Sequence, residues 1–369
     1  MTIQQECRQF VEKYIKPFAN QHDQQERIPA ELIQQIAQAG YLETVLPPEY
    51  GGRNMDMLSF GLINEEFAKG CSATKALLTT QSMVQLSLLK WGNTEQKSTW
   101  LPKLASGESI AAFALTEPDI GSDVKHIQMT AELQGSDYIL NGTKKWITLG
   151  QLADIFLIFA KCHGKITAFL VPRDTEGLSI KPITGLLGMR AAMLAKLELQ
   201  NCRVPQENIV GAVGFGFTHV MLTALDYGRY SIAWGAVGLA QACLEDCLQY
   251  TANRSQFQVP IKEHQLIKHM ITDMVVDISA ARNLCYQAGY LKDTKDSDSI
   301  LATLVAKYFA AKVAFKIASD TVQIHGANGC GNEYAAQRHF RDAKIMEIIE
   351  GSNEVLQNFI AQSYRRYSA

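Results

Sequence analysis

The segment IFLIFAKCHGKITAFLVP, residues 155–172, decides the fold class of this chain. Two apolar runs rich in β-branched and aromatic residues flank the turn sequence His163-Gly164-Lys165, and this pattern is typical of a β-hairpin. The same chemistry continues on both sides, with a turn at Asn141-Gly142 and an alternating run, LAKLELQNCRVP, at 194–205. We therefore predict an antiparallel β domain over residues 111–213.

The regions on either side of this segment have the apolar spacing of helices. Before it, the stretches ELIQQIAQAGYL (31–42) and SFGLINEEFAKG (59–70) repeat apolar residues every three or four positions. After it, longer apolar stripes run through 217–253, 263–292 and 299–325. The sequence thus predicts a mostly α-helical protein with a middle β domain. Its predicted parts are an N-terminal helical domain at 1–110, the β domain at 111–213 and a C-terminal helical bundle at 214–369.

The composition is that of an ordinary globular protein large enough for a sizeable core. Of 369 residues, 47% are hydrophobic and 20% charged. Lys plus Arg number 35 and Asp plus Glu 37, and this balance gives no electrostatic reason to expect nucleic acid or an anionic membrane as partner. No apolar run approaches the ~20 residues that span a bilayer. The amphipathic N-terminus does not resemble a secretion signal.

The eight cysteines show neither a CxxC pair nor the spacing of a zinc site, so we predict no metal. Cys243 and Cys247 are interpreted as core thiols on one helix face. A chain of this kind is expected in the reducing cytoplasm.

The segment RDAKIMEIIEGSNEV (341–355) holds the most suggestive candidate catalytic residue. Glu350 follows an apolar stretch, and a carboxylate among apolar neighbours has a raised pKa, which suits a general base. The alternative is a helix-end glutamate that faces water. Ser352, followed by Glu354, has the pattern of a helix N-cap with an acidic residue in the first turn.

Three further segments are candidate ligand sites, each with a plainer alternative. TEPDIGSD (116–123) offers hydroxyls and backbone N–H groups to an anion, but it also reads as a simple turn. Trp146 is either a core residue or a platform for a cofactor. RSQFQVPIKEHQ (254–265) reads by itself as a solvated loop between helices. There is no Rossmann or P-loop motif.

Together these segments resemble the acyl-CoA dehydrogenase family. The matching motifs occur in the family's order from about residue 5 to residue 365, and are LPPEYGG, TEPDIGSD, NGTKKWIT, RSQF, EHQ, QIHGANG and RDAKIMEIIEGS. The resemblance implies the family's three-domain fold. It also implies FAD bound between the β domain and the bundle, in a homotetramer or homodimer.

The resemblance assigns cofactor contacts residue by residue. Near the flavin and pyrophosphate it places Leu115, Thr116, Gly121, Ser122, Trp146 and Thr148. It assigns Arg254, Phe257 and Gln265 to the FAD of a neighbouring subunit. Gln323, Gly326 and Ala327 are expected at the adenine end, and Ser352 and Glu354 beside the cofactor.

The same resemblance makes Glu350 the catalytic base in the α,β-dehydrogenation of an acyl thioester. The other position that carries a base in some family members is Gly228 here, and glycine has no side chain to act as one. The substrate is expected against Ser122, Asp226, Arg229, Gly351 and Lys75. Arg229 either orients the base or forms an ion pair with Asp226.

Two departures from the family pattern concern the substrate. Where the family usually has R-A-S-D-T, this chain has Arg190-Ala191-Ala192-Met193-Leu194, which favours members that act on groups tethered to an acyl carrier protein in polyketide or peptide biosynthesis. The alternative is an ordinary acyl-CoA dehydrogenase of fatty-acid or amino-acid catabolism. Lys75 falls where the glutaryl branch has an arginine that binds a distal carboxylate, but it can also be read as a solvated helix lysine.

Other functions stay open at this point. The same fold could oxidise a carrier-bound aldehyde or aminoacyl group, or act as an oxidase whose reduced flavin reacts with dioxygen instead of an electron-transfer flavoprotein. A different class is a flavin-less scaffold or binding protein. The complete motif set and Glu350 argue for the enzyme.

Overall fold

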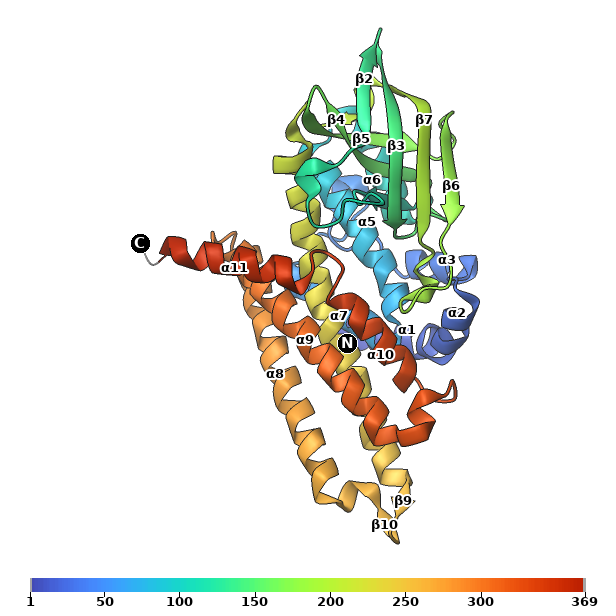
Figure 1. The fold of residues 1–369 in the computed structure, drawn as a ribbon, viewed down its shortest axis with the longest axis vertical. Helices are drawn as coiled ribbons and strands as arrows, with labels where there is room; N and C mark the ends of the chain where they lie inside the picture. The colour runs from blue at the N-terminus through green and yellow to red at the C-terminus, as the bar shows by residue number, and fades with distance from the viewer. Residues whose placement is uncertain (1, 368–369) are drawn as a thin grey trace.

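The computed structural model describes residues 2–367, and it begins with six helices packed beside the β domain (Figure 1). Thr2 accepts a hydrogen bond from the backbone N–H of Gln5 and starts the first helix with a capping box. Asp56 caps the fourth helix in the same way, accepting from the N–H of Ser59 at 2.7 Å. The helices are α1 (Ile3–Tyr14), α2 (Ala19–Gln25), α3 (Ala30–Gln38), α4 (Met57–Gly70), α5 (Ser72–Trp91) and α6 (Thr94–Ser106).

The β domain follows as one sheet whose strand order is β6-β7-β3-β2-β4-β5-β8. The predicted hairpin is confirmed, because β4 and β5 pair antiparallel from Ile155 opposite Pro172 to Cys162 opposite Lys165. The strands are β1 (Ala111–Ala114), β2 (Thr130–Gln134), β3 (Asp137–Ile147), β4 (Ile155–Cys162), β5 (Lys165–Pro172), β6 (Leu178–Pro182), β7 (Ala195–Pro205) and β8 (Ile209–Val210).

The prediction of a purely antiparallel sheet is wrong in one respect. β1 runs parallel to β4 along its whole length, and β2 is parallel to β4 at one pairing, Thr130 with Lys161. Some forty residues separate β1 from β4, which is ample for the crossover that parallel strands require. Local turn signals could not reveal this long-range pairing.

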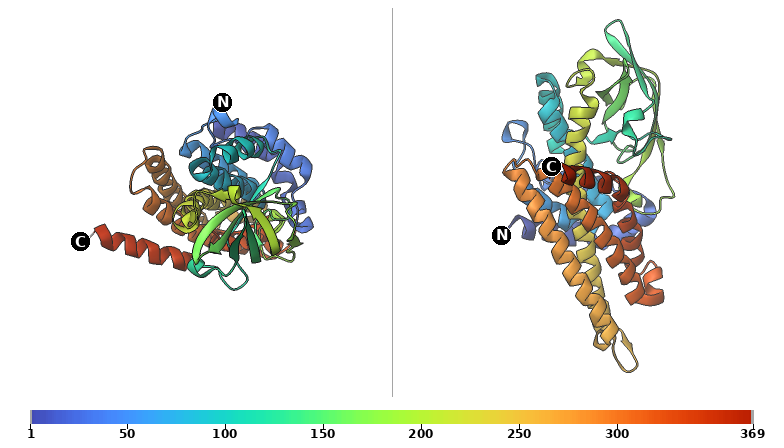
Figure 2. Two further views of the ribbon diagram at one scale, coloured as in Figure 1. Left: turned by 90° about the horizontal axis from the view of Figure 1, so that it is seen from above. Right: turned by 60° about the vertical axis from the view of Figure 1, so that its left-hand side comes forward.

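The C-terminal part is a bundle of long helices, as predicted. Its helices are α7 (Leu222–Asn253), α8 (Gln265–Asp293), α9 (Ser299–His325), α10 (Ala336–Met346) and α11 (Asn353–Tyr367), with a π-helical turn at Gly216–Met221 before α7. The segment interpreted as a loop after α7 contains a small hairpin, β9 (Ser255–Gln256) and β10 (Val259–Pro260). Figures 1 and 2 show this hairpin at the end of the bundle far from the β domain, and α11 projecting sideways.

Helix α7 is the central element because α4, α5, α8 and α9 all pack on it. Two glycines of its contact with α4 allow close approach. A Cβ on Gly61 would lie 2.3 Å from Nε1 of Trp234, and one on Gly238 would lie 2.1 Å from the carbonyl oxygen of Glu65. A side chain at either position would push α4 away from α7. The packing therefore fixes the part of α7 that carries Gly228 and Arg229.

The cysteines bear out the prediction of core thiols. All eight are free, and only Cys330 is exposed. Cys243 and Cys247 are fully buried in the cluster that α7 forms with α8 and α9. Within residues 2–367, none of the helices combines the length and apolar character needed to cross a membrane.

Candidate active site

Glu350 lies in the turn between α10 and α11, in a left-handed backbone conformation with φ of 57°. Two buried cations hold this turn through its carbonyl oxygens. Nε of Arg229 donates to the carbonyl of Glu350 at 2.9 Å, and Nζ of Lys307 donates to the carbonyl of Gly351 at 2.8 Å. Both cations come from long helices, α7 and α9. The backbone at Glu350 is therefore fixed by the bundle, which is how a strained left-handed conformation is maintained.

One oxygen of the Glu350 carboxylate is shielded from water although the residue as a whole is partly exposed, and this favours the buried interpretation of the residue. Its Oε2 is buried and has no hydrogen-bond partner among the described residues. Burial raises the pKa of Glu350 to about 7, against the opposing effect of Arg229, Lys307 and Lys75. Such a carboxylate takes up and releases a proton near neutral pH, as a general base must.

Because Gly228 has no side chain, the carboxylate of Glu350 can occupy the space beside it. A Cβ at Gly228 would lie 2.4 Å from Oε2 and 2.8 Å from Cδ of Glu350.

Arg229 was predicted either to orient the base or to pair with Asp226, and the structure distinguishes the two. Asp226 pairs with Lys292 at 2.5 Å, while Arg229 holds the turn at Glu350. Asp226 thus serves an ion pair between α7 and α8, which does not support its predicted role as a substrate ligand.

Lys75 is completely buried on α5, so its interpretation as a solvated helix lysine is wrong. Its Nζ has no hydrogen-bond partner among the described residues. A Cβ at Gly235 would lie 3.0 Å from this Nζ, which places the amine against α7. Burial lowers the pKa of Lys75 to about 7, and Glu350 acts in the opposite direction. An unpaired buried amine is costly, so its presence beside the candidate base calls for a ligand.

A row of hydrogen-bonded polar groups lies next to Lys75. The hydroxyls of Thr79 and Ser231 are 2.8 Å apart, and Ser231 donates to Oδ1 of Asn64 at 2.6 Å. All three side chains are buried between α4, α5 and α7. The wall beside Lys75 is therefore polar rather than purely aliphatic.

The TEPDIGSD loop is anchored at one end and open at the other. The buried Glu117 accepts from Nζ of Lys144 at 2.8 Å and from the N–H of Gln128 at 2.5 Å. Lys144 also donates to the carbonyl of Leu115 at 3.0 Å. By contrast, a Cβ at Gly121 would meet no atom within 4 Å, and Ser122 is exposed. The loop thus presents Gly121 and Ser122 outward from a rigid base.

Trp146 is not a core residue. Its side chain is 47% exposed, and its backbone is left-handed with φ of 63°. The N–H of Lys145 donates to the carbonyl of Thr116 at 2.8 Å, which brings Trp146 beside the TEPDIGSD loop. Thr148 follows on the same chain segment and is half-buried. An exposed indole beside an open polar loop fits a platform for a flat ring.

Ser352 and Glu354 begin α11. Oγ of Ser352 accepts from the N–H of Val355 at 3.4 Å, so the predicted N-cap is confirmed, with Glu354 in the first turn. Ser352 follows Gly351 directly and Glu354 lies three residues after it, so both stand next to the turn at Glu350.

The second predicted group of cofactor residues lies elsewhere. Arg254, Phe257, Gly326 and Ala327 line a cavity of about 500 Å³ at the hairpin end of the bundle. Phe257 is 89% exposed there. Gln265 and Gln323 are exposed on adjoining helices, at the start of α8 and near the end of α9, but they do not line this cavity. In Figures 1 and 2 the hairpin and the β domain stand at opposite ends of the molecule.

Sequence reasoning missed two of the residues that build the site. Lys307 lies in the apolar helix ATLVAKYFAAKVAF, where a single lysine on a buried face was the available signal. Lys144 was part of a quoted motif, but its pairing with Glu117 bridges 27 residues and has no local signature.

The fold and the site together define a family of enzymes, and comparison with known proteins agrees. The chain matches the family models "Acyl-CoA dehydrogenase, N-terminal domain" at 1–108, "middle domain" at 112–202 and "C-terminal domain" at 214–364. The chain belongs to the acyl-CoA dehydrogenase family.

Individual relatives cover nearly the whole chain. The mitochondrial short-chain specific acyl-CoA dehydrogenase of Sus scrofa is 36% identical, over 98% of this chain and 90% of its own length. The glutaryl-CoA dehydrogenase of Desulfococcus multivorans is 37% identical, over 97% of this chain and 94% of its own. The butyryl-CoA dehydrogenase structure from Megasphaera elsdenii has a TM-score of 0.94 at 33% identity, covering 99% of this chain and 98% of that one.

Two further solved structures bear on the cofactor and the carrier. A Mycobacterium smegmatis glutaryl-CoA dehydrogenase in complex with FADH2 has a TM-score of 0.94 at 32% identity, covering 98% of this chain and 93% of that one. The prolyl acyl carrier protein oxidase AnaB has a TM-score of 0.93 at 29% identity, covering 98% and 97%.

Proposed function

We propose that this chain catalyses the FAD-dependent α,β-dehydrogenation of an acyl thioester, with Glu350 as the base. The observation that carries this proposal is the shielded Oε2 of Glu350, which has no hydrogen-bond donor among the residues that the structure describes and faces the gap left by Gly228. Its raised pKa of about 7 lets it remove a proton near neutral pH.

The turn at Glu350 supplies a second catalytic group. Its backbone N–H donates no hydrogen bond within the described part of the chain, so it is available to the thioester carbonyl. A donor aimed at the oxygen that gains charge stabilises an enolate-like transition state, typically by about 3–4 kcal/mol. Arg229 and Lys307 hold this N–H in place through the neighbouring carbonyls. When bound beside Trp146 and Thr148, FAD would supply the hydride acceptor for the β carbon, so that loss of both hydrogens gives the 2-enoyl thioester.

The cofactor would be held by residues of two copies of the chain. The flavin side is assigned to the TEPDIGSD loop with Trp146 and Thr148, and the adenine side to the cavity around Arg254 and Phe257. Since these groups stand at opposite ends of one chain, a single FAD reaches both only if a second copy supplies one of them. This supports a homodimer or homotetramer. Arg254→Gln is expected to release FAD faster from the assembled protein.

Lys75 is proposed to bind an anionic end of the acyl group. The carboxylate of Glu350 lies beside Gly228 and the amine of Lys75 lies beside Gly235. The seven residue steps from Gly228 to Gly235 along α7 span ~10.5 Å. Allowing ~3 Å for contact at each end leaves ~4–5 Å between the α carbon and the anion. That span fits a short acyl chain with a carboxylate three or four bonds from the α carbon. Lys75 would bind it as a point charge.

The carrier of the acyl group is proposed to be CoA or an acyl carrier protein, and different observations favour each. The relatives of 36–37% identity are named for CoA esters, whereas the carrier-protein oxidase is 29% identical. The segment 190–194, which favoured a carrier protein, has a packing role, because Ala191 and Ala192 are buried in the N-terminal core. CoA is therefore the better-supported carrier.

The test is anaerobic bleaching of the bound flavin by a matched panel of thioesters. The panel pairs glutaryl and butyryl groups, each on CoA and on an acyl carrier protein. Bleaching by a CoA ester is expected, faster with the glutaryl group. Bleaching only by groups bound to an acyl carrier protein would instead assign the enzyme to a biosynthetic pathway that uses carrier proteins. Protein that cannot be loaded with FAD would contradict the proposal and support a scaffold instead.

The electron acceptor is proposed to be an electron-transfer flavoprotein. The rate at which the substrate-reduced flavin is reoxidised in air distinguishes such a dehydrogenase from an oxidase. Slow reoxidation is expected, whereas rapid reoxidation with release of hydrogen peroxide would identify an oxidase.

A further inference from the structure

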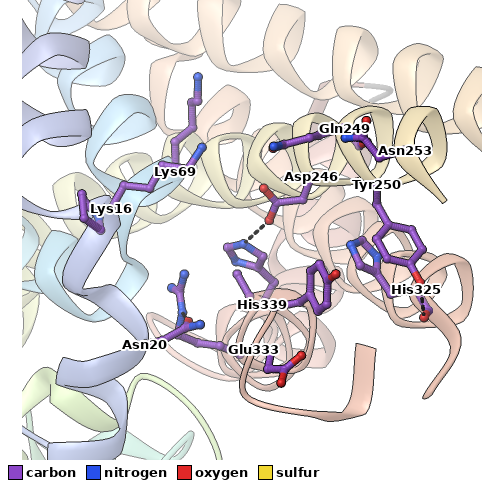
Figure 3. Close-up of a pocket in the computed structure, with 14 residues that line it drawn as sticks. Lys16, Asn20, Lys69, Asp246, Gln249, Tyr250, Asn253, His325, Glu333 and His339 are labelled. Carbon is purple, nitrogen blue, oxygen red and sulfur yellow. Dashed lines mark hydrogen bonds and ion pairs between the residues drawn. The ribbon is translucent and has the colours of Figure 1, made fainter. Parts of the chain in front are cut away.

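A second cavity, of about 420 Å³, lies between the N-terminal helices and the bundle (Figure 3). Its walls come from five separate parts of the chain, the segment at Lys16 and Asn20, the end of α4, the end of α7, the end of α9 and the start of α10. The volume is within the range of small-molecule sites. Nothing in the proposed dehydrogenation uses it.

Two buried side chains that line this cavity carry nitrogens without a partner. Arg338 is 3% exposed, and its Nη1 has no hydrogen-bond partner among the described residues, the nearest carboxylate being that of Asp342 at 3.9 Å. His339 is 2% exposed, and its Nδ1 is likewise unpaired. Buried polar nitrogens are almost always paired in folded proteins. Nη1 of Arg338 can only donate, so it points to an absent acceptor, whereas Nδ1 of His339 is itself an acceptor when Nε2 donates to Asp246.

The neighbouring hydrogen bonds explain why these nitrogens stay free. Nε of Arg338 donates to Oδ1 of Asn20 at 2.8 Å, which fixes one side of the guanidinium. Nε2 of His339 lies 3.3 Å from Oδ2 of Asp246, as the dashed line in Figure 3 marks. Burial opposes the charge on Asp246, but its contact with His339 and the nearby Lys16 and Arg338 hold the pKa of that carboxyl below its usual value.

The charges around the cavity favour an anion. Lys16, Lys69 and Arg338 line it, and Lys16 forms no ion pair with any described residue. Of the two acidic side chains in the lining, Asp246 is engaged by His339, and Glu333 is exposed to solvent. Lys69 pairs with Glu245 at 2.8 Å, and Arg338 has only the long contact of 3.9 Å with Asp342. Among the described residues, the cavity therefore has one unpaired lysine, Lys16, and one guanidinium whose Nη1 lacks a close acceptor.

This cavity is separate from the proposed cofactor cavity. The two share only Tyr250 and His325, whose rings stack with centroids 4.2 Å apart. The hydroxyl of Tyr250 donates to the carbonyl of His325 at 3.2 Å and accepts from Nδ2 of Asn328 at 3.0 Å. This bonded pair forms a wall between the two spaces.

We propose that the cavity is a binding site for a small oxyanion, a carboxylate or phosphate group, received by Arg338 with Lys16 at its rim. The ligand would accept hydrogen bonds from Nη1 of Arg338 and from the side chain of Lys16. Asn20 positions the guanidinium of Arg338 by accepting the hydrogen bond from its Nε.

The test measures binding to the FAD-loaded protein with two probes, inorganic phosphate and malonate, by calorimetry and by the shift in melting temperature. Lys16→Gln removes the exposed cation, and Gln249→Glu adds a negative charge of nearly the same shape at the exposed rim. Both residues are exposed, so the variants are expected to fold. Lys13→Gln, on the exposed face of α1, is the matched control.

Saturable binding is expected for at least one probe, and each rim variant should weaken it about tenfold, the effect of one charge-assisted contact. Lys13→Gln should bind as the wild type does. Equal affinity in all four proteins, or no saturable binding, would overturn the proposal. Preference for phosphate or for malonate would identify which anion the site receives.

Discussion

Replacing Lys75 by methionine should stabilise the protein while removing its preference for an anionic acyl group. The amine is fully buried and unpaired, and burial lowers its pKa from 10.5 to about 7. A depressed lysine pKa means that the unfolded chain binds more protons between pH 7 and 10.5, so stability rises with pH across that window. Below it, the lysine costs the folded state up to about 5 kcal/mol, at about 1.4 kcal/mol per pKa unit.

Methionine keeps the length of the side chain and removes this cost. The gain in unfolding free energy should therefore be largest near pH 6, up to about 5 kcal/mol, and fall to about 2 kcal/mol at pH 9. The assay is urea denaturation of wild type and variant at both pH values. Lys90→Met is the control, because Lys90 is an exposed residue of the same helix.

The outcome that refutes this reasoning is a variant less stable than the wild type, or a gain that does not change with pH. Flavin bleaching gives an independent readout. The variant should lose its preference for glutaryl over butyryl thioesters, whereas the control should keep it. A lysine that binds substrate at the cost of stability is an ordinary compromise at functional sites.

Three other variants test the rest of the site. Glu350→Gln should keep FAD but lose anaerobic bleaching, and unchanged bleaching would exclude Glu350 as the base. Above pH 7 the free energy of unfolding of this variant should exceed that of the wild type by up to about 3 kcal/mol, because the raised pKa of Glu350 costs stability once the group ionises. Gly228→Ala should keep its helix, but its flavin should bleach at least 100-fold more slowly, because the new Cβ would lie 2.4 Å from Oε2 of Glu350 and displace it. A wild-type bleaching rate in stopped-flow would contradict this geometry. Glu117→Gln should cost about 3–5 kcal/mol by leaving the buried Lys144 without a counter-charge, read as a lower melting temperature and faster FAD loss. A neutral effect would mean that the ion pair does not anchor the loop.

The order of helical, β and helical regions could be predicted from the sequence because it depends on local periodicity. The β4–β5 hairpin follows from a glycine turn between apolar runs, and the long helices follow from uninterrupted apolar stripes. The N-cap at Ser352 is equally local. The parallel pairing of β1 with β4 was not predictable, because it joins strands some forty residues apart.

The candidate site, like the fold, has features that could be predicted from local sequence and features that could not. Motif chemistry was enough to name Glu350, Trp146 and the TEPDIGSD loop as candidates, since each stands in a short recognisable segment. Whether Glu350 faces water or a sealed space, and whether Lys75 is solvated or buried, depends on which helices cover them. Desolvation and charge act through space, and a pKa is set by neighbours that lie hundreds of residues away in the chain. The sequence by itself therefore determined the elements and the candidate groups, and only the tertiary structure decided their burial, their partners and the direction in which their pKa values move.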